Sequence, residues 1–372
     1  MALTNFAALT AEQLTVWSRT TWKNARNASF LNRFLGTGSN SMIQRITELK
    51  KTEKGARAVI SLVADLEGDG TAGDRVLEGN EEAMKSFDQV IQIDQLRHAN
   101  RHQGRIADQQ SVINFREESR DVLSYWLGER LDQMAFLTLT GVAYTFNTDG
   151  STRVGSDLPF LEFASDVTAP TTNRHQRWDS TLFLQAGDTS AVAAVDLPSW
   201  EMLVKAKAYV KKQFMRPIRG EGPFSGNVLY NVFSSPDAIA HLKLDADFLA
   251  AWRNAMPRSA SNPLFKDTDV YFVDNLAIRE FHHVFNTLGA TSGVDKWGAG
   301  SNIDGSATLI CGAQSLGFAD IGDPFWVEKK FDYDNQPGIS YGKICGMKKP
   351  VFRSHATGTD EDFSVLRLDH AI

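Results

Sequence analysis

The sequence predicts a water-soluble protein of the α+β class. Its 372 residues are enough to bury a sizeable core, in two or three structural units at about 150 residues each. Hydrophobic residues make up 42% and charged residues 23%, close to the average of globular proteins. A long helical pattern is followed by segments in which strand and helix patterns alternate, which indicates a mixed architecture.

The first segment, residues 1–57, is basic, with nine Lys or Arg residues against three acidic ones. Aromatic residues, among them Trp17, Trp22 and Phe30, lie between these charges. Such a segment can lie along another surface while its polar face stays hydrated. Two interpretations stay open: a pair of surface helices with basic faces, or an arm that docks on a partner.

Residues 58–104 predict two strands around a long, flexible loop. The mostly apolar run AVISLVA and the partly alternating run SFDQVIQIDQL flank the Gly- and Asp-rich stretch DLEGDGTAGDRVLEGNEE. A two-stranded ribbon is marginal in water, because it buries few apolar side chains. We therefore expect it to need support from another surface, although a hairpin packed on its own domain remains an alternative.

Residues 110–141 give the strongest helix prediction. Apolar residues from Phe115 to Leu137 recur mostly at steps of three and four, with charged residues between them. At 1.5 Å per residue, such a helix is roughly 45 Å long. Gly128 inside it predicts a slight bend or a close backbone contact.

The second half of the chain predicts an insertion and then alternating strands and helices. Residues 147–198 are rich in Ser, Thr, Asp and Gly, which indicates a loop-dominated insertion. Ser199 is the expected N-cap of the next helix. NVLYNVF at 227–233 predicts a strand, and Pro236 begins another helix. Further strands follow, around a short helical stretch expected near Gln314.

A phosphate-binding loop and the hydrolase nucleophile elbow, G-x-S-x-G, are both expected to be missing from the chain. GTGSN at Gly36–Asn40 lacks the Lys of a phosphate-binding loop. GPFSG at Gly222–Gly226 places Ser225 one position too late for the apex of a hydrolase nucleophile elbow. Neither nucleotide hydrolysis nor serine catalysis is therefore expected.

The histidines are weak candidates for a metal site. His98 and His102 have a spacing that could place them on one helix face, but Ala99 stands where a zincin has its Glu. His282 and His283 are adjacent, so in a strand they would point to opposite faces, and a role at a strand end is expected.

Two other patterns also favour structural roles. Asp65, Glu67 and Asp69 resemble the start of a calcium loop, but Val76 occupies the position of the bidentate Glu, so solvated turn residues are the better interpretation. Cys311 and Cys345 are not part of a C-x-x-C pair and are expected to be buried. We predict no catalytic, cofactor-binding or metal-binding residues and no cofactor.

Charge and hydropathy limit the partners. The formal net charge of −6 and a pI of about 5.8 disfavour a surface devoted to coating nucleic acid. No run approaches the 20 or so apolar residues of a membrane span, and the N-terminus lacks a secretion signal, so no membrane contact or export is expected.

Six segments carry a further pattern through their order and spacing. They are VLEGNEEAMKSFDQVIQIDQLRHANRHQG (76–104), QQSVINFREESRDVLSYW (109–126), SSPDAIAHLKLDADF (234–248), NPLFKDTDVYFVDNLAIREF (262–281), ATLICGAQSLGFA (307–319) and FDYDNQPGISYGKICGMKKPVF (331–352). Together they resemble the major capsid proteins of tailed bacteriophages, in the podovirus-type branch. The resemblance covers most of the chain.

The resemblance implies the capsid fold that tailed phages share with the herpesvirus capsid floor. It implies an N-terminal arm, an extended loop (E-loop), a peripheral domain with a long spine helix, and an axial domain. The spine helix is expected at about 108–141. The implied ranges are 1–57 for the arm, 58–104 for the E-loop, 105–226 for the peripheral domain including the insertion 147–198, 227–325 for the axial domain, and 326–372 for the return to the peripheral domain.

The implied function is that of a structural, non-enzymatic subunit. Many copies would assemble as pentamers and hexamers into an icosahedral virion shell around double-stranded DNA, without sequence-specific binding. Assembly in the host bacterial cytoplasm with scaffold, portal and decoration proteins is compatible with this role. Alternatives are an encapsulin-like protein cage, a metal-dependent enzyme using His98 and His102, and a nucleic-acid-binding module using residues 1–57.

Overall fold

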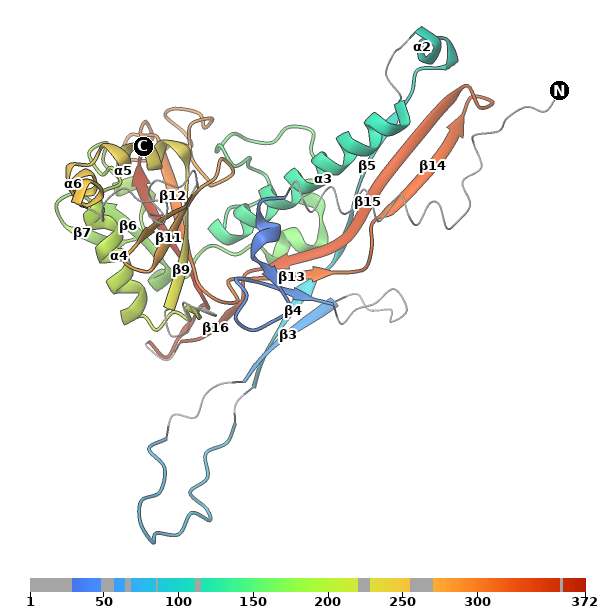
Figure 1. Ribbon diagram of the computed structural model, residues 1–372. Helices are drawn as coiled ribbons and strands as arrows, with labels where there is room; N and C mark the ends of the chain where they lie inside the picture. The colour runs from blue at the N-terminus through green and yellow to red at the C-terminus, as the bar shows by residue number, and fades with distance from the viewer. Residues whose placement is uncertain are drawn as a thin grey trace.

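The fold is elongated, with a compact half, a blade and a projecting two-stranded ribbon (Figure 1). The compact half is built on an eight-stranded sheet, and the blade on part of a six-stranded sheet and a long helix. This arrangement confirms the predicted α+β class. The computed structural model describes residues 29–47, 57–63, 68–84, 86–110, 115–219, 228–254, 270–354 and 357–372.

The long helix α3 (Phe115–Thr140) confirms the helix predicted within residues 110–141. Its 26 residues give a length of about 39 Å. The short helix α2 (Arg105–Gln110) precedes it. Val122 and Tyr125 in the first half are exposed, whereas every residue from 131 to 140 is buried. The C-terminal half of α3 therefore enters the core, while the first half extends along the blade.

The six-stranded sheet is organised around one long strand, β15. Its strands are β1 (Leu35–Gly36), β2 (Ile43–Ile46), β5 (Asp94–Arg101), β13 (Leu316–Asp320), β14 (Phe325–Phe331) and β15 (Gln336–Lys348). The end of β15 pairs with β13, while its first part pairs with β5 on one side and β14 on the other, always antiparallel. We call the three-stranded part β5–β15–β14, together with α3, the blade.

The ribbon consists of β3 (Arg57–Val63) and β4 (Ser86–Gln92), paired antiparallel, which confirms two strands around a loop. The second predicted strand is, however, divided: after Ile93 the chain continues as β5 and joins the other sheet. β15 passes this junction closely at Gly346, where a Cβ atom would overlap the carbonyl oxygen of Gln92. Position 346 therefore requires glycine, because any side chain there would clash where β15 passes the end of β4.

The eight-stranded sheet forms the compact half together with three helices. Its strands are β6 (His175–Asp179), β7 (Phe183–Ala186), β8 (Ile218–Arg219), β9 (Val228–Ser234), β10 (Val270–Val273), β11 (Leu276–Glu280), β12 (Gly305–Cys311) and β18 (Val365–Ala371). The helices are α4 (Trp200–Lys212), α5 (Pro236–Leu244) and α6 (Ala246–Asn254). Ser199 caps α4 as predicted, because its hydroxyl accepts a hydrogen bond from the Met202 N–H.

Short elements complete the fold. They are the 3₁₀ turns η1 (Leu31–Phe34), η2 (Leu158–Phe160), η3 (Glu162–Asp166), η4 (Thr172–Arg174) and η5 (Thr189–Ala191), and the strand pair β16 (Val351–Arg353) and β17 (Asp360–Asp362).

Two predictions from local sequence need correction. The insertion 147–198 is not wholly loop, because β6 pairs with β18 and extends the eight-stranded sheet through β7. Gln176 and Trp178 alternate inward along β6, so the strand is stabilised by burial that its polar composition conceals. The stretch near Gln314 is a turn rather than a helix, and Gln314 itself has a positive φ of 56°.

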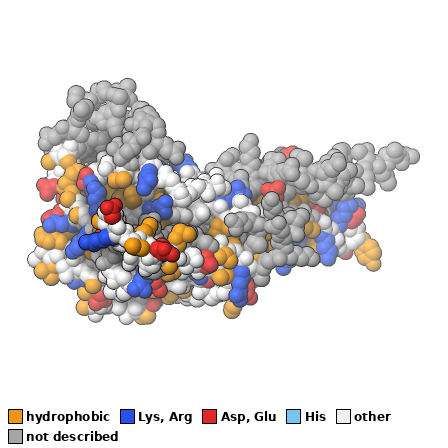
Figure 2. Space-filling view, turned by 90° about the horizontal axis from the view of Figure 1, so that it is seen from below, with side chains coloured by type: hydrophobic (Ala, Val, Ile, Leu, Met, Phe, Trp, Pro, Cys, Tyr) orange, Lys and Arg blue, Asp and Glu red, His pale blue; other side chains and the backbone are white. Residues whose placement is uncertain are grey.

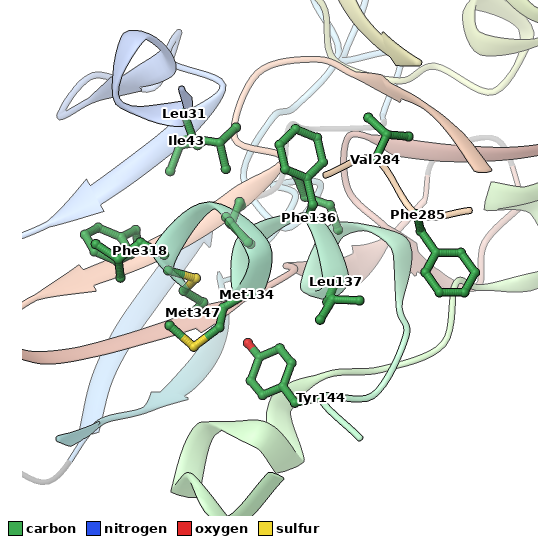
Figure 3. Close-up of a cluster of buried hydrophobic side chains, with 14 of the residues drawn as sticks. Leu31, Ile43, Met134, Phe136, Leu137, Tyr144, Val284, Phe285, Phe318 and Met347 are labelled. Atoms are coloured by element: carbon green, nitrogen blue, oxygen red, sulfur yellow. The ribbon is translucent and has the colours of Figure 1, made fainter. Parts of the chain in front are cut away.

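The largest hydrophobic cluster joins the halves of the molecule. It places Met134 and Phe136 of α3 against Phe318 and Met347 of the six-stranded sheet, and it continues to Phe233 in the eight-stranded sheet. Figure 3 shows α3 side chains at the centre of this cluster. Because both sheets pack on the same helix, α3 fixes their relative position.

Asp132 of α3 holds the beginning of the described chain. Its buried carboxylate accepts hydrogen bonds from the Ser29 hydroxyl (2.6 Å) and from the Phe30 and Leu31 N–H groups (2.7 and 3.2 Å). Phe30 then stacks on Phe281, with ring centroids 4.1 Å apart. Burial raises the pKa of Asp132, while these hydrogen bonds oppose the rise. The segment after residue 28 is thus anchored on α3.

His370 lies fully buried in a hydrogen-bonded chain. Its Nδ1–H donates to the Ala371 carbonyl (2.9 Å), so Nε2 accepts from the Thr308 hydroxyl (2.8 Å). Ser234 continues the chain at 2.9 Å from Thr308. Burial lowers the pKa of His370 to about 4, because a charged imidazolium would lose its hydration there.

Removing the Asp132 carboxylate is expected to destabilise the folded protein. Asp132→Ala leaves three hydrogen-bond donors without their acceptor and should cost about 2–4 kcal/mol, whereas Asp132→Asn keeps one acceptor and should cost less. Urea unfolding measures the loss. Glu118→Gln, at an exposed position of the same helix, is the control, and equal stability of Asp132→Ala and Glu118→Gln would refute the anchor.

Lowering the pH is expected to destabilise the folded protein through His370. Because folding lowers the pKa of this side chain from 6.5 to about 4, the unfolded chain binds the proton first as the pH falls. Its contribution is complete above about pH 6.5, and roughly 3 kcal/mol is lost toward pH 4.

Urea unfolding between pH 7 and pH 4 tests this dependence. His370→Asn should be less stable at pH 7 but should show a flatter dependence on pH. His98→Asn, at an exposed site, should keep the full dependence. A His370→Asn variant that loses as much stability on acidification as the parent protein would contradict the assignment.

Candidate assembly surfaces

The residues considered for metal binding have structural roles. Among the described residues, no three His, Cys, Asp or Glu side chains are grouped to hold a metal ion. His98 lies on the extended strand β5 and His102 just after it, so the two side chains do not share a helix face. His98 stacks on Trp126 at 4.8 Å and His102 meets Phe115 edge-on at 4.9 Å, so both pack α3 on the blade sheet.

His282 and His283 lie just after a strand end, as expected, so the opposite orientation that neighbouring residues have within a strand does not apply to them. β11 ends at Glu280, and the two rings lie in the following turn with centroids 4.0 Å apart. Burial and the nearby positive charges of His282, Arg130 and Arg153 lower the pKa of His283 to about 4.

The remaining motif candidates give no reactive site. Asp65 and Glu67 lie outside the described residues, as do Gly222–Gly226, while Asp69 is exposed and belongs to no helix, strand or turn. Cys311 and Cys345 are free and fully buried, which confirms the expected burial.

The expectation that the chain lacks G-x-S-x-G is wrong, because the pattern occurs as GISYG at 338–342. It lies inside the continuous strand β15, where Ser340 pairs with Ala99 and Val327. The sharp strand-to-helix turn of a hydrolase elbow is therefore absent at this site.

The ribbon loop, defined here as residues 68–84, is the most exposed described segment. Every residue in it except the partly buried Thr71 is exposed, including Val76 (68% exposed), Leu77 (59%) and Met84 (77%). The base of the ribbon is different, because Ile60 and Ile91 are buried with Ala319 and Phe352. The ribbon is thus fixed on its own subunit, whereas its loop projects from it (Figure 1).

The charge on the side to which the ribbon loop projects is mixed. Figure 2 views the molecule from this side, and in its coloured part hydrophobic side chains are interspersed with both basic and acidic ones. Small apolar groups among charges suit an interface that remains soluble before it forms.

The blade carries a second surface on the side away from α3. Leu96, His98 and Tyr341 face the helix, so the alternate residues of β5, β15 and β14 face outward. They line an open groove of about 510 Å³. We call it the blade groove; its lining includes Arg97, Ala99, Arg101, Val327, Lys329, Phe331, Gly338, Ser340 and Gly342.

Sequence reasoning found the ribbon loop but missed the blade groove. The only local signal is the alternation of small residues Gly338, Ser340 and Gly342 along β15. These small residues form the bottom of a groove only because β15 pairs with β14 and with β5, which lies over 230 residues earlier in the chain. Asp132 was also missed, because a single acid in an amphipathic helix resembles a surface residue.

None of the helices that the structure describes is both long enough and apolar enough to span a membrane.

The fold is similar to that of solved phage capsid proteins. The capsid protein of Ralstonia phage GP4 superposes with a TM-score of 0.73 at 24% identity, over 92% of this chain and 91% of the other. The capsid protein of cyanophage Pam1 gives a TM-score of 0.71 at 20% identity, over 99% of both chains. At these identities the likeness establishes the fold and confirms the predicted capsid architecture.

Sequence comparison establishes the family. The profile of the phage capsid protein family matches residues 5–372. The major capsid protein of Pseudomonas phage KPP25 is 55% identical over 368 residues, which cover 98% of this chain and 96% of that protein. These matches support the shell-forming interpretation and not the protein-cage alternative. The chain therefore belongs to the phage capsid protein family, and its function is that of a major capsid protein, the structural subunit of a phage shell.

Proposed function

We propose that copies of this subunit associate through reciprocal contacts into pentamers and hexamers, which close into an icosahedral shell. The observation that carries this proposal is the ribbon loop, which exposes Val76, Leu77 and Met84 away from the core of its own subunit. Each such loop gains burial only on another molecule. When each subunit gives its loop to one neighbour and receives a loop from another, the contacts close a ring.

The proposal keeps the predicted domain ranges and changes the assignment of three strands. Residues 1–57 act as the arm, 58–104 as the E-loop, 105–226 and 326–372 as the peripheral domain, and 227–325 as the axial domain. Sheet membership cuts across these ranges, because β6, β7 and β18 belong to the sheet that contains β9–β12. The compact half is therefore assigned to the axial domain together with these strands.

The proposed content of the shell is double-stranded DNA held without sequence-specific contacts. The formal net charge of −6 supports this, because strong release of counterions would hinder packing and ejection of DNA. Assembly takes place in the host bacterial cytoplasm, with a scaffold, a portal and decoration proteins as possible partners in the virion. The subunit performs no catalysis and uses no cofactor or metal.

Removing most of the ribbon loop is expected to abolish shell formation but not folding. Replacing residues 70–82 with a short Gly-Ser linker halves the connection between β3 and β4, which changes the free energy of unfolding by only about 0.6 kcal/mol. Electron microscopy and sedimentation velocity should show shells, or rings of five and six, for the parent protein and only small species for the variant.

The control is thermal unfolding of both proteins in the unassembled state, which should give similar midpoints. Shells formed at the parental yield by the shortened protein would refute the role of the loop. A parent protein that forms no rings or shells in any solution condition would refute the proposed function itself.

A further inference from the structure

Helix α4 and the short stretch after it concentrate positive charge on the compact half. Residues 202–219 contain six Lys or Arg residues and no acidic one, in a chain whose formal net charge is −6. Lys207 pairs with Asp274. The other five are exposed and form no ion pair within the described part of the chain: Lys205, Lys211, Lys212, Arg216 and Arg219. We call these five side chains, together with the exposed Val204 and Phe214, the basic face.

The basic face points away from the core and from α3. In β9, Val232 packs in the hydrophobic cluster of α4, whereas the next residue, Phe233, packs on the other side of the sheet in the cluster of α3. Ile310 and Leu309 of β12 divide in the same way. Helix α4 therefore covers the face of the eight-stranded sheet opposite to α3 (Figure 1), and its charged side is turned outward.

Phe214 occupies a position at which glycine is the usual residue. The end of α4 is a Schellman motif, because the Met215 N–H donates to the Val210 carbonyl (3.2 Å) and the Phe214 N–H to the Lys211 carbonyl (3.1 Å). The motif needs a positive φ at residue 214, where φ is 51°. A residue with a Cβ atom is disfavoured in this conformation, and this phenylalanine is 68% exposed. It therefore adds apolar surface among the cations at a cost to the fold.

A second aromatic residue lies at the other end of the basic face. Phe183 also has a positive φ, 64°, and the Lys205 ammonium lies over its ring at 4.3 Å. The basic face thus presents cations with apolar groups between and beside them. Acidic residues interspersed with apolar ones have the complementary chemistry.

These features favour a separate protein over a second copy or DNA. Lysine is depleted from the contacts between permanently associated subunits, so a lysine-rich helix face is a poor contact between copies. Long-range attraction between opposite charges instead speeds the capture of a partner from solution. A DNA backbone would use the cations but would leave Val204 and Phe214 uncovered, because its contacts are with phosphates.

We propose that the basic face binds an acidic polypeptide segment of a separate protein. Carboxylates of the segment pair with Lys211, Lys212 and Arg216, and its apolar side chains cover Val204 and Phe214. From residue 204 to 214 the face is about 15 Å long, which about five extended residues span. This inference rests on the proposed function and gives the subunit a docking site that is separate from the ribbon loop and the blade groove.

Peptide binding by the full-length, unassembled subunit tests the charges. The probe is a fluorescein-labelled peptide, Glu-Leu-Glu-Glu-Leu-Glu, measured by fluorescence anisotropy at low salt. Lys205→Gln with Lys211→Gln and Lys212→Gln should weaken binding about tenfold. The control removes three exposed cations from other elements, Arg57→Gln with Arg105→Gln and Arg353→Gln, and should stay within about twofold of the parent. No binding by the parent, or equal weakening by both triple variants, would overturn the proposal.

Phe214→Gly separates a contact residue from a structural one. Because glycine suits a positive φ, the variant should unfold at the same temperature as the parent or a higher one, yet bind the peptide about fivefold more weakly. Unchanged peptide binding would overturn the apolar contact. A 20-bp DNA duplex that binds the parent more tightly than the peptide, with no effect of Phe214→Gly, would overturn the polypeptide assignment in favour of nucleic acid.

Electron microscopy separates this inference from the proposed function. The triple variant of Lys205, Lys211 and Lys212 should form shells at the parental yield, since the basic face is not a contact between copies. A folded triple variant that forms no shells would overturn the inference and make the face a subunit contact. Absence of shells in the parent protein would refute the proposed function alone, because peptide binding is measured on the unassembled subunit.

Discussion

The backbone pairing of β15 with three strands is the interaction on which the elongated shape depends. Its 13 residues bond to β13 at one end and to both β5 and β14 at the other. A three-stranded sheet extending from a core has little burial of its own, so it needs a strand that is anchored inside. β15 provides this, and α3 covers one face of the extension. The opposite face is left open as the blade groove.

Buried ion pairs hold the same strand and the chain beyond it. Lys343 contacts Asp320, which Arg45 also binds, and Lys349 bonds to Asp362 at 2.8 Å. Burial lowers the pKa of both lysines and raises the pKa of Asp362, while the partner charges oppose these shifts. Such pairs add little net stability, but losing one partner leaves a buried charge. We interpret them as fixing the register of β15.

Local patterns predicted the elements whose stability is local. The 26-residue helix α3, the Ser199 cap and the paired ribbon all follow from periodicity and side-chain chemistry within a few residues. β6 was missed because its partner β18 lies about 190 residues away, and the strand is stable only within that sheet. The candidate site divides in the same way: the exposed loop was predictable, whereas the groove exists only after three distant strands pair.

The junction at Ile93 connects the fold to assembly. Along the chain only Ile93 separates β4 from β5, and Asp166 steadies this junction by accepting from the Gln92 N–H at 2.8 Å and from Lys348 at 3.2 Å. Because Ile60 and Ile91 at the base of the ribbon are buried with Ala319 and Phe352, this junction sets the direction in which the ribbon loop leaves the subunit.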